Sequence, residues 1–358
     1  MDFKLGEHLR GLPGPILISG HTGFKGTWLS FLLEYLGVPT IGYSLSPEKN
    51  SLYDRAKLTG KIPEIYADIR DAGTLEKFME THRPSAIIHM AAQPLVLQSY
   101  KTPRETFDVN VMGTVNILEQ AFATDYVRAV IVVTTDKVYR NDNSGRAFIE
   151  SDPLEGKDPY SASKVGAEAA ISAWQQIQKI SGGPMVVSVR AGNVIGGGDW
   201  AENRLIPDLI RGFTSGTPAE IRNPASTRPW QHVLDPLVGY LMTLEHVLDG
   251  GKITSINFAP LGNSLSVADV ATIAQACWGE SPKIKFSQFQ IPDVYEAPTL
   301  ALDASYGSSL FENACHWSQE KSITKSITWW KKLMQESLNA EECVKSDIQE
   351  FLSDIAAP

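Results

Sequence analysis

Short apolar stretches alternate with longer segments of helical periodicity through the first half of the chain. The apolar stretches cover residues 15–19, 40–43, 62–67, 85–89, 129–133 and 185–190, and the helical patterns cover residues 24–36, 106–122 and 162–180. This alternation is typical of βαβ units, whose parallel strands are buried on both faces. The sequence therefore predicts an α/β fold built on a Rossmann-type, doubly wound parallel sheet.

The pattern changes after residue 190, where glycine, proline and asparagine become frequent. Helical periodicity returns at residues 205–213 and 234–248, and residues 255–258 have the pattern of a strand. We expect the segment around residues 234–260 to return to the main sheet. The predicted division is a Rossmann domain of residues 1–190 and about 232–260, with a smaller C-terminal substrate-binding region of about 191–231 and 261–358.

A glycine-rich turn, residues 20–26 (GHTGFKG), follows the first predicted strand and opens the first predicted helix. Glycines there allow a tight turn, and they let backbone amides at a helix N-terminus approach a pyrophosphate. An ordinary strand-to-helix turn is the alternative. The predicted cofactor contacts in this turn are Gly20, Thr22, Gly23, Phe24, Lys25 and Gly26.

The position that usually distinguishes NAD from NADP carries no acidic residue. A carboxylate about 20 residues after the glycine turn typically binds the ribose hydroxyls of NAD. Residues 42–45 read GYSL here, and the next carboxylate is Glu48. This position therefore does not select between the two cofactors. Asp68, after the third predicted strand, is predicted to hydrogen-bond the adenine, with a helix N-cap as the alternative.

Two polar groups of residues are placed for chemistry. Thr135, Asp136 and Lys137 follow the apolar stretch 129–133, at the strand end where open α/β sheets bind ligands. Tyr160 and Lys164 lie four residues apart, so on a helix they share one face. A phenol beside an ammonium is a tunable acid or base. The alternative is a tyrosine packed in the core and a solvated lysine.

Composition narrows the classes of function. The net charge of -9 argues against a nucleic-acid-binding protein. The three cysteines are far apart, which suggests free thiols, and the seven histidines lack metal-ligand spacing, so no metal site is predicted. No apolar run approaches the roughly 20 residues of a membrane span. We therefore expect a cytoplasmic protein with no membrane partner.

Several longer strings resemble a known family. They are residues 20–26, 91–96 (AAQPLV), 110–114 (NVMGT), 135–137 (TDK), 190–200 (RAGNVIGGGDW) and 228–233 (RPWQHV), together with the Tyr160 and Lys164 pair. With these motifs the chain resembles the extended short-chain dehydrogenase/reductase superfamily and, within it, the CDP-glucose 4,6-dehydratases. The resemblance covers most of the chain. It adds Ile69, Ala91, Ala92 and Gln93 to the expected cofactor contacts, beside Tyr160 and Lys164.

The resemblance implies an NAD-dependent lyase that acts on a nucleotide sugar, with CDP-glucose favoured. Such an enzyme oxidises C4, eliminates water across C5 and C6, and returns the hydride to C6. Tyr160 would be the base for C4 oxidation, tuned by Lys164, with Thr135 orienting the hydroxyl. Asp136 would protonate the departing 6-hydroxyl. Lys137 would remove the C5 proton, or would only position Asp136 through an ion pair.

The nucleotide sugar also requires binding groups. Arg228 is the first candidate, because a guanidinium grips phosphate bidentately; Asn193, Arg204 and His232 are further candidates, and a solvated Arg204 is an alternative. The resemblance further implies a homodimer formed through the helices at 106–122 and 162–180. Two other functions stay open, another nucleotide-sugar enzyme such as a 4-epimerase or a decarboxylase, and a non-catalytic dinucleotide sensor.

Overall fold

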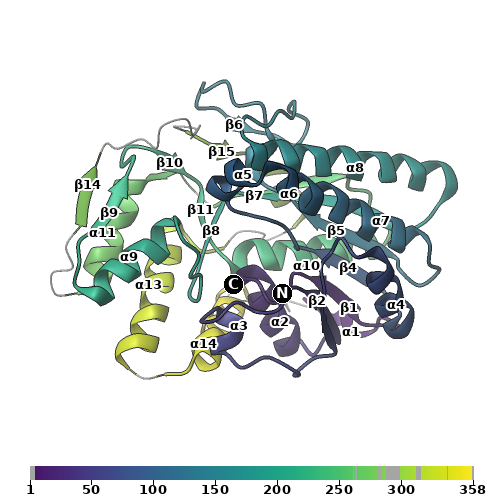
Figure 1. Cartoon of the computed structure of the whole chain (residues 1–358), viewed down its shortest axis with the longest axis horizontal. Helices are drawn as coiled ribbons and strands as arrows, with labels where there is room; N and C mark the ends of the chain where they lie inside the picture. The colour runs from purple at the N-terminus through teal and green to yellow at the C-terminus, as the bar shows by residue number, and fades with distance from the viewer. Residues whose placement is uncertain are drawn as a thin grey trace.

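The computed structural model describes residues 5–260, 262, 264–279, 284–287, 299–311, 316–336 and 338–356. Its centre is a seven-stranded parallel sheet in the order β12-β7-β5-β4-β1-β2-β3 (Figure 1). The strands are β1 Ile16–Ser19, β2 Thr40–Ser44, β3 Glu64–Tyr66, β4 Ala86–His89, β5 Ala129–Val133, β7 Met185–Ala191 and β12 Ser255–Phe258. The predicted doubly wound sheet is confirmed.

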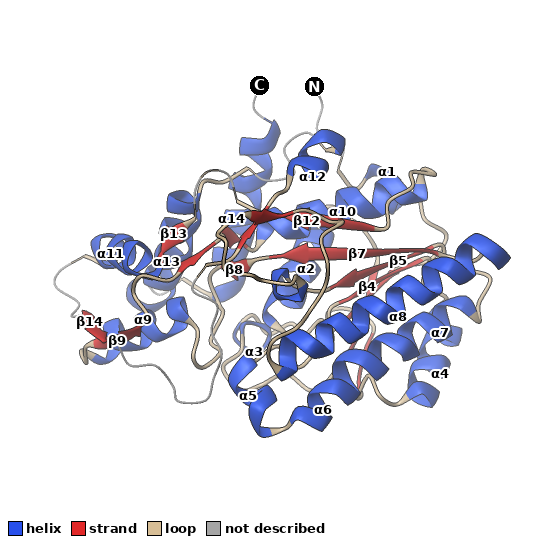
Figure 2. Ribbon diagram, turned by 90° about the horizontal axis from the view of Figure 1, so that it is seen from above, coloured by secondary structure: helices blue, strands red, loops and turns tan. Residues whose placement is uncertain are grey.

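Each strand contributes side chains to two hydrophobic layers, because successive side chains of a strand point to opposite faces of the sheet. In β5, Val130 and Val132 pack into one apolar cluster, and Ile131 and Val133 pack into the other. Figure 2 shows α4, α7 and α8 side by side along one face. The first cluster includes residues of α4 Ala72–His82, α7 Gly113–Phe122 and α8 Pro159–Ser181; the second includes residues of α2 Phe24–Tyr35 and α10 Leu234–Leu248.

The helix predicted at residues 106–122 is interrupted. It begins as α6 Pro103–Phe107, passes through a π-helical turn at Asp108–Met112, and continues as α7. Asn110 lies in this turn and donates to Ser163 Oγ (2.8 Å) and to the Gln93 carbonyl (3.1 Å). Its side-chain oxygen accepts from the Gln93 amide (2.8 Å). The extra residue of a π-turn thus aims one amide at the loop after β4 and at the start of α8.

A smaller region lies beside the sheet, where α9 Leu205–Ser215, α11 Val267–Trp278 and α13 Gln319–Gln335 pack together (Figure 1). β12 returns to the main sheet beside β7, as the pattern at residues 255–258 predicts. The last helix, α14 Ala340–Ala356, packs on α2 and on α3 Leu52–Arg55. Part of the C-terminal segment therefore covers the sheet domain.

Short elements complete the described chain. They are α1 Glu7–Arg10, α5 Val96–Lys101, α12 Ser305–Leu310, a 3-10 turn Asp136–Val138, β6 Ala147–Phe148, β8 Asn193–Ile195, β9 Ala219–Arg222, β10 Thr227–Arg228, β11 Trp230–His232, β13 Leu265–Ser266, β14 Ile284–Ser287 and β15 Ala301–Leu302. Among the helices described, none has both the length and the apolar character needed to span a membrane. Cys277 and Cys343 are free thiols, and Cys315 lies outside the described residues.

Candidate active site

The chain makes a sharp turn after β5, and the residues of this turn belong to the candidate site. Thr135 is extended, and its hydroxyl oxygen accepts from the Lys137 amide (3.4 Å), which caps the 3-10 turn of residues 136–138. The turn points the carboxylate of Asp136 inward, where its side chain has no exposed surface. Thr135 is 6% exposed. The strand end therefore delivers a hydroxyl and a carboxylate to a sheltered place, as polar residues at the carboxyl edge of a parallel sheet do.

The two oxygens of Asp136 have different surroundings. Oδ1 accepts from the Thr135 hydroxyl (2.9 Å) and from Lys137 Nζ (3.1 Å). Oδ2 is buried and has no hydrogen-bond partner among the described residues. A buried carboxylate oxygen left without a donor is costly, and such atoms concentrate where a ligand or a proton completes the bonding. Oδ2 is therefore the position in this group best suited to hold a transferable proton.

The start of α8 supplies the phenol and the ammonium. Asp158 and Ser161 form a reciprocal capping box that fixes the first turn of the helix. Tyr160 and Lys164 follow on the buried face, at 8% and 6% exposure. Lys164 Nζ donates to the Val133 carbonyl (3.1 Å), which ties α8 to the end of β5. The structure thus brings Tyr160 and Lys164 to the strand end that carries Thr135 and Asp136.

Burial dominates the electrostatics of this pair. It raises the pKa of Tyr160 to about 12, while a hydrogen bond with Thr135 and the charge of Arg204 act in the opposite direction. Burial lowers the pKa of Lys164 to about 8, and the Glu168 carboxylate opposes that shift. Tyr160 is therefore a neutral phenol in this protein, and it becomes a base only when further positive charge or a proton acceptor is present.

A buried polar network around Glu168 influences the charge of Lys164. Glu168 forms a bidentate pair with Arg190 (2.8 Å to each oxygen) and also accepts from Thr134 and Ser188 (2.6 Å each). Burial raises the pKa of Glu168, but the bonds and charge of Arg190 outweigh it, so the net pKa is lowered. Glu168 is ionised, and its fixed negative charge keeps Lys164 from losing its proton entirely.

The glycine-rich turn fits a dinucleotide pyrophosphate. Gly20 has φ 78°, and a Cβ there would lie 2.8 Å from the Ala91 amide nitrogen. A Cβ on Gly26 would lie 2.1 Å from the Gly20 carbonyl oxygen. The N-terminus of α2 at Gly23 has no side-chain cap and no acidic residue in its first turn. Its amides and its dipole are therefore available to an anion.

The remaining predicted cofactor residues line the same strand ends. The hydroxyl of Thr22 forms hydrogen bonds with the hydroxyl of Ser44 (2.7 Å) and with the carbonyl of Leu45 (3.0 Å), at the end of β2. Asp68 is bound by Arg70 (2.6 Å) and does not cap α4, because Asp71 does. The other members follow β1, β3 or β4 in the chain, and they are Phe24, Ile69, Ala91, Ala92 and Gln93.

The histidine at the end of β4 is a core residue. Nδ1 of His89 lies 2.6 Å from Ser19 Oγ, and Nε2 lies 3.1 Å from Thr114 Oγ1. Both nitrogens are therefore satisfied, and burial lowers the pKa of His89 to about 3. Among the described residues, no group of three or more His, Cys, Asp and Glu side chains is arranged to hold a metal ion.

The predicted substrate residues are placed differently from one another. Arg204 donates to Asp199 (3.1 Å), and its charge acts on Tyr160 and on Lys25, so it belongs to the site. Asn193 begins β8, paired with β11, and Arg228 is buried in β10. The ring of His232 is fully buried against Trp28 and Trp317, so it contributes no exposed surface to a substrate site.

The sequence assigned Lys25 only a place in the glycine turn and did not identify Tyr240. Lys25 Nζ donates to the Tyr240 hydroxyl (3.0 Å), and the charges of Lys164, Arg204 and Asp136 act on it. The available signal was a lysine in the first turn of a helix, where the helix dipole disfavours a cation. Tyr240 is an apolar-face residue of α10, and no sequence pattern marks it.

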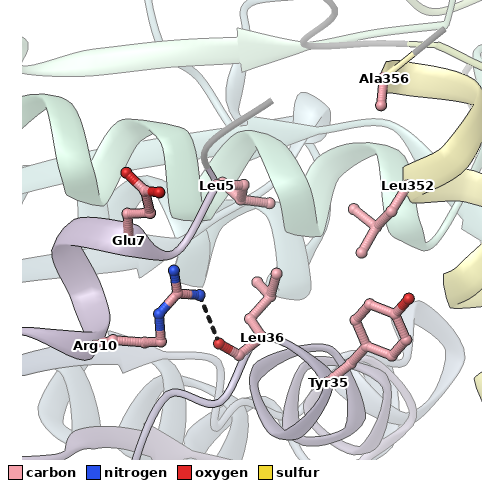
Figure 3. Close-up of a pocket in the computed structure, with 7 residues that line it drawn as sticks. All are labelled: Leu5, Glu7, Arg10, Tyr35, Leu36, Leu352 and Ala356. Carbon is pink, nitrogen blue, oxygen red and sulfur yellow. Dashed lines mark hydrogen bonds between the residues drawn. The ribbon is translucent and has the colours of Figure 1, made fainter. Parts of the chain in front are cut away.

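A separate hollow of about 340 Å³ opens on another part of the surface. Figure 3 shows it between α1, the end of α2 and α14, with Arg10 donating to the Leu36 carbonyl (2.9 Å). The residues that line it are Leu5, Glu7, Arg10, Tyr35, Leu36, Leu352 and Ala356. None of the predicted site residues lines this hollow, so the hollow does not mark the candidate active site.

The chain was compared with known protein families and relatives. Residues 16–259 match the NAD dependent epimerase/dehydratase family. The chain belongs to this family. It is 36% identical over 347 residues, 94% of the chain and 96% of the relative, to a CDP-glucose 4,6-dehydratase of Salmonella typhimurium. It is 26% identical over 281 residues, 74% of the chain and 80% of the relative, to a UDP-glucose 4-epimerase of Halalkalibacterium halodurans.

The fold has solved counterparts. A dTDP-glucose 4,6-dehydratase from Streptomyces venezuelae, solved with NAD bound, superimposes with a TM-score of 0.76 at 22% identity. The match covers 91% of this chain and 99% of that one. At this identity the likeness establishes the fold alone. The expected Rossmann-type architecture of this family is confirmed.

Proposed function

We propose that this protein is an NAD-dependent nucleotide-sugar 4,6-dehydratase, a hydro-lyase that converts CDP-glucose to CDP-4-keto-6-deoxyglucose and water. One observation carries the proposal. Asp136, a buried carboxylate whose Oδ2 has no hydrogen-bond partner in the part of the chain that the structure describes, stands beside the Tyr160 and Lys164 pair. The pair suffices for oxidation at C4, whereas elimination of water also needs a proton donor. The similarity to a CDP-glucose 4,6-dehydratase, 36% identity over 94% of this chain, supports the same reaction.

The first half of the reaction uses Tyr160, Lys164 and Thr135. NAD, held at the glycine turn, supplies hydride transfer. Tyr160 takes the proton of the C4 hydroxyl, and Thr135, hydrogen-bonded to Tyr160, orients that hydroxyl. Lys164 favours the phenolate through its charge. Because burial is the main cause that raises the Tyr160 pKa to about 12, we infer that the phenolate forms only in the loaded site, where positive charge is added.

The second half uses the strand-end pair. Asp136 holds a proton on Oδ2 and donates it to the departing 6-hydroxyl. The ketone at C4 acidifies the C5 proton, and Lys137 is our proposed base for its removal. The 3.1 Å contact between Lys137 Nζ and Asp136 Oδ1 supports the other role, in which Lys137 stays charged and positions the carboxylate. Lys137 is 30% exposed, so its proton can exchange with solvent.

Replacing Lys137 with methionine separates these two roles. If Lys137 is the base, C4 oxidation stays measurable as cofactor reduction, and deuterium exchange from solvent into C5 falls by about 100-fold. Mass spectrometry of the sugar after incubation in D₂O measures the exchange. Lys77→Met, an exposed lysine on α4, is the matched control. Undiminished exchange in Lys137→Met would assign Lys137 the positioning role.

Substrate binding completes the proposal. Arg204 is held by Asp199 close to Tyr160, so we propose that its remaining donors bind the diphosphate or the sugar. Arg228 and Asn193 are proposed for the nucleotide side. His232 lies in β11, and we propose that its fully enclosed ring acts by packing against Trp28 and Trp317.

A direct assay tests the function. The purified protein is incubated with NAD and, separately, with the glucose esters of CDP, dTDP, GDP and UDP. We expect a product lighter by one water, formed fastest from CDP-glucose. A 4-epimerase would instead give a product of unchanged mass with inverted C4, and a dinucleotide sensor would bind NAD without turnover. The absence of water loss with every sugar would refute the dehydratase proposal.

We also propose a homodimer formed through α6, the π-turn, α7 and α8. Phe107 and Met112 are 41% and 48% exposed, and Ala169 and Ala173 are exposed on α8, where small residues permit close helix packing. Covering these apolar residues is favourable. Light scattering at micromolar concentration is expected to give twice the chain mass, and Met112→Lys is expected to shift it to the monomer. A monomeric wild type would contradict the dimer.

The domain division and the location remain predictions. We propose that residues 1–190 and about 232–260 bind NAD, and that about 191–231 and 261–358 bind the nucleotide sugar. By sequence α14 belongs to the second of these parts, but it packs on α2 and α3 and therefore stabilises the NAD-binding part. A cytoplasmic location stays an expectation from the sequence.

A further inference from the structure

The 3-10 turn of residues 136–138 leads directly into a buried tyrosine. Tyr139 is 2% exposed, and its ring stacks on Phe148 with 5.2 Å between the ring centres. Its hydroxyl donates to Asn257 Oδ1 (2.7 Å) and accepts from Arg190 Nη1 (2.8 Å). Burial raises the pKa of Tyr139 to about 12, so the phenol keeps the proton that it donates. Through this hydroxyl, Tyr139 is attached to two strands of the main sheet, β7 and β12.

Both partners of the hydroxyl are also held by other contacts. Arg190 in β7 and Asn257 in β12 lie opposite each other in the sheet register. Arg190 forms its bidentate pair with Glu168 and donates to the Glu150 carbonyl (3.0 Å). The side-chain nitrogen of Asn257 donates to the Phe148 carbonyl (3.0 Å). The sheet therefore presents a charged donor and an amide acceptor at fixed positions, and both bind the tyrosine hydroxyl.

The turn before Tyr139 carries the residues that we propose for elimination. At its start, the bond from the Lys137 amide to the Thr135 hydroxyl is 3.4 Å, which is long for a hydrogen bond. In a 3-10 helix, side chains three residues apart lie on the same side. Asp136 and Tyr139 have this spacing and both are buried, whereas Lys137 is 30% exposed. A displacement of Tyr139 would therefore also displace the carboxylate of Asp136.

We propose that Tyr139 is a positioning residue for the elimination half of the reaction. Its hydroxyl, fixed by Arg190 and Asn257, sets where the turn places the Asp136 carboxylate. An acid must lie about 2.6–3.2 Å from the atom that it protonates, so small displacements of this carboxylate slow the departure of the 6-hydroxyl. Oxidation at C4 uses Tyr160, which α8 positions. This inference rests on the proposed dehydratase function.

Replacing Tyr139 with phenylalanine removes the hydroxyl and keeps the ring on Phe148. The backbone bond from the Glu155 amide to the Val138 carbonyl (2.8 Å) remains, so the turn is expected to stay folded. In a single turnover with CDP-glucose, water loss is expected to fall about 10-fold, because a misplacement of about 1 Å can cost 10²-fold. The rate of cofactor reduction and the KM are expected to be unchanged, so reduced cofactor accumulates. Cofactor absorbance and the mass of the sugar are measured on the same sample.

Asn257→Ala tests the same contact from the other side. Arg190 still holds the hydroxyl in this variant, so we expect a smaller loss of elimination than in Tyr139→Phe, again with normal cofactor reduction. The double variant is expected to eliminate water as fast as Tyr139→Phe alone, because both changes remove one shared contact. Effects that multiply in the double variant would show that the two residues act separately. If Asn257→Ala does not fold, the single turnover of Tyr139→Phe decides alone.

Ile348→Val is the control for a general loss of stability. It removes one methyl group from a fully buried position on α14, so it is expected to lower the melting temperature without changing the ratio of water loss to cofactor reduction. If wild type loses no water from any nucleotide sugar, the dehydratase proposal itself fails. If wild type is active and Tyr139→Phe slows both steps equally, or neither step, the positioning role is wrong.

Discussion

Replacing Tyr160 with phenylalanine is expected to lower kcat by about 10³-fold while NAD still binds. The change removes the hydroxyl that we propose takes the C4 proton, and proton transfer by a positioned side chain contributes roughly 10²- to 10⁴-fold. The ring stays in its buried place on α8, so the loss of one hydrogen bond with Thr135 costs only about 1 kcal/mol of stability. The measurement is initial cofactor reduction in a single turnover with CDP-glucose.

The control for Tyr160→Phe is Tyr35→Phe, a matched change at an exposed tyrosine far along α2. NAD binding is measured by the quenching of tryptophan fluorescence, and it is expected to be the same in both variants and in wild type. More than a tenth of wild-type cofactor reduction in Tyr160→Phe would show that another group removes the C4 proton. Lost NAD binding would instead show that the phenol supports the cofactor site.

Replacing Asp136 with asparagine is expected to separate oxidation from elimination. The amide cannot donate a carboxylic proton to the 6-hydroxyl, so water loss is expected to fall by about 10²- to 10³-fold. Oxidation at C4 does not need that proton, so reduced cofactor is expected to accumulate with the 4-keto sugar still carrying its 6-hydroxyl. Cofactor absorbance and the mass of the trapped sugar are measured on the same sample.

The matched control for Asp136 is Asp125→Asn, which changes an exposed aspartate that forms an ion pair with Arg83 on the surface. It is expected to behave as wild type. Asp136→Asn also leaves Lys137 without its ion pair, so its melting temperature is compared with wild type before the kinetics are interpreted. Normal water loss in a folded Asp136→Asn would remove Asp136 from the acid role, and solvent would have to supply the proton.

Local patterns were sufficient for the elements of the sheet. Five consecutive apolar β-branched or small residues at 129–133 form β5, and the glycines that follow residues 15–19 form the turn before α2. These features depend on near neighbours in the chain, which is why sequence alone predicts them. The interruption of the helix at 106–122 was not predicted, because the π-turn is set by the contacts of Asn110 with Gln93 and Ser163.

The candidate site divides in the same way. The sequence by itself was enough to predict the residues that we propose for the chemistry, because the strand end at Thr135 to Lys137 and the four-residue spacing of Tyr160 and Lys164 are local patterns. Only the tertiary structure decided that Oδ2 of Asp136 has no hydrogen-bond partner among the residues described, that Lys25 contacts Tyr240, and that His232 lies inside the core. Burial and long-range charge set those properties, and both depend on residues that are distant in the chain and come together only on folding.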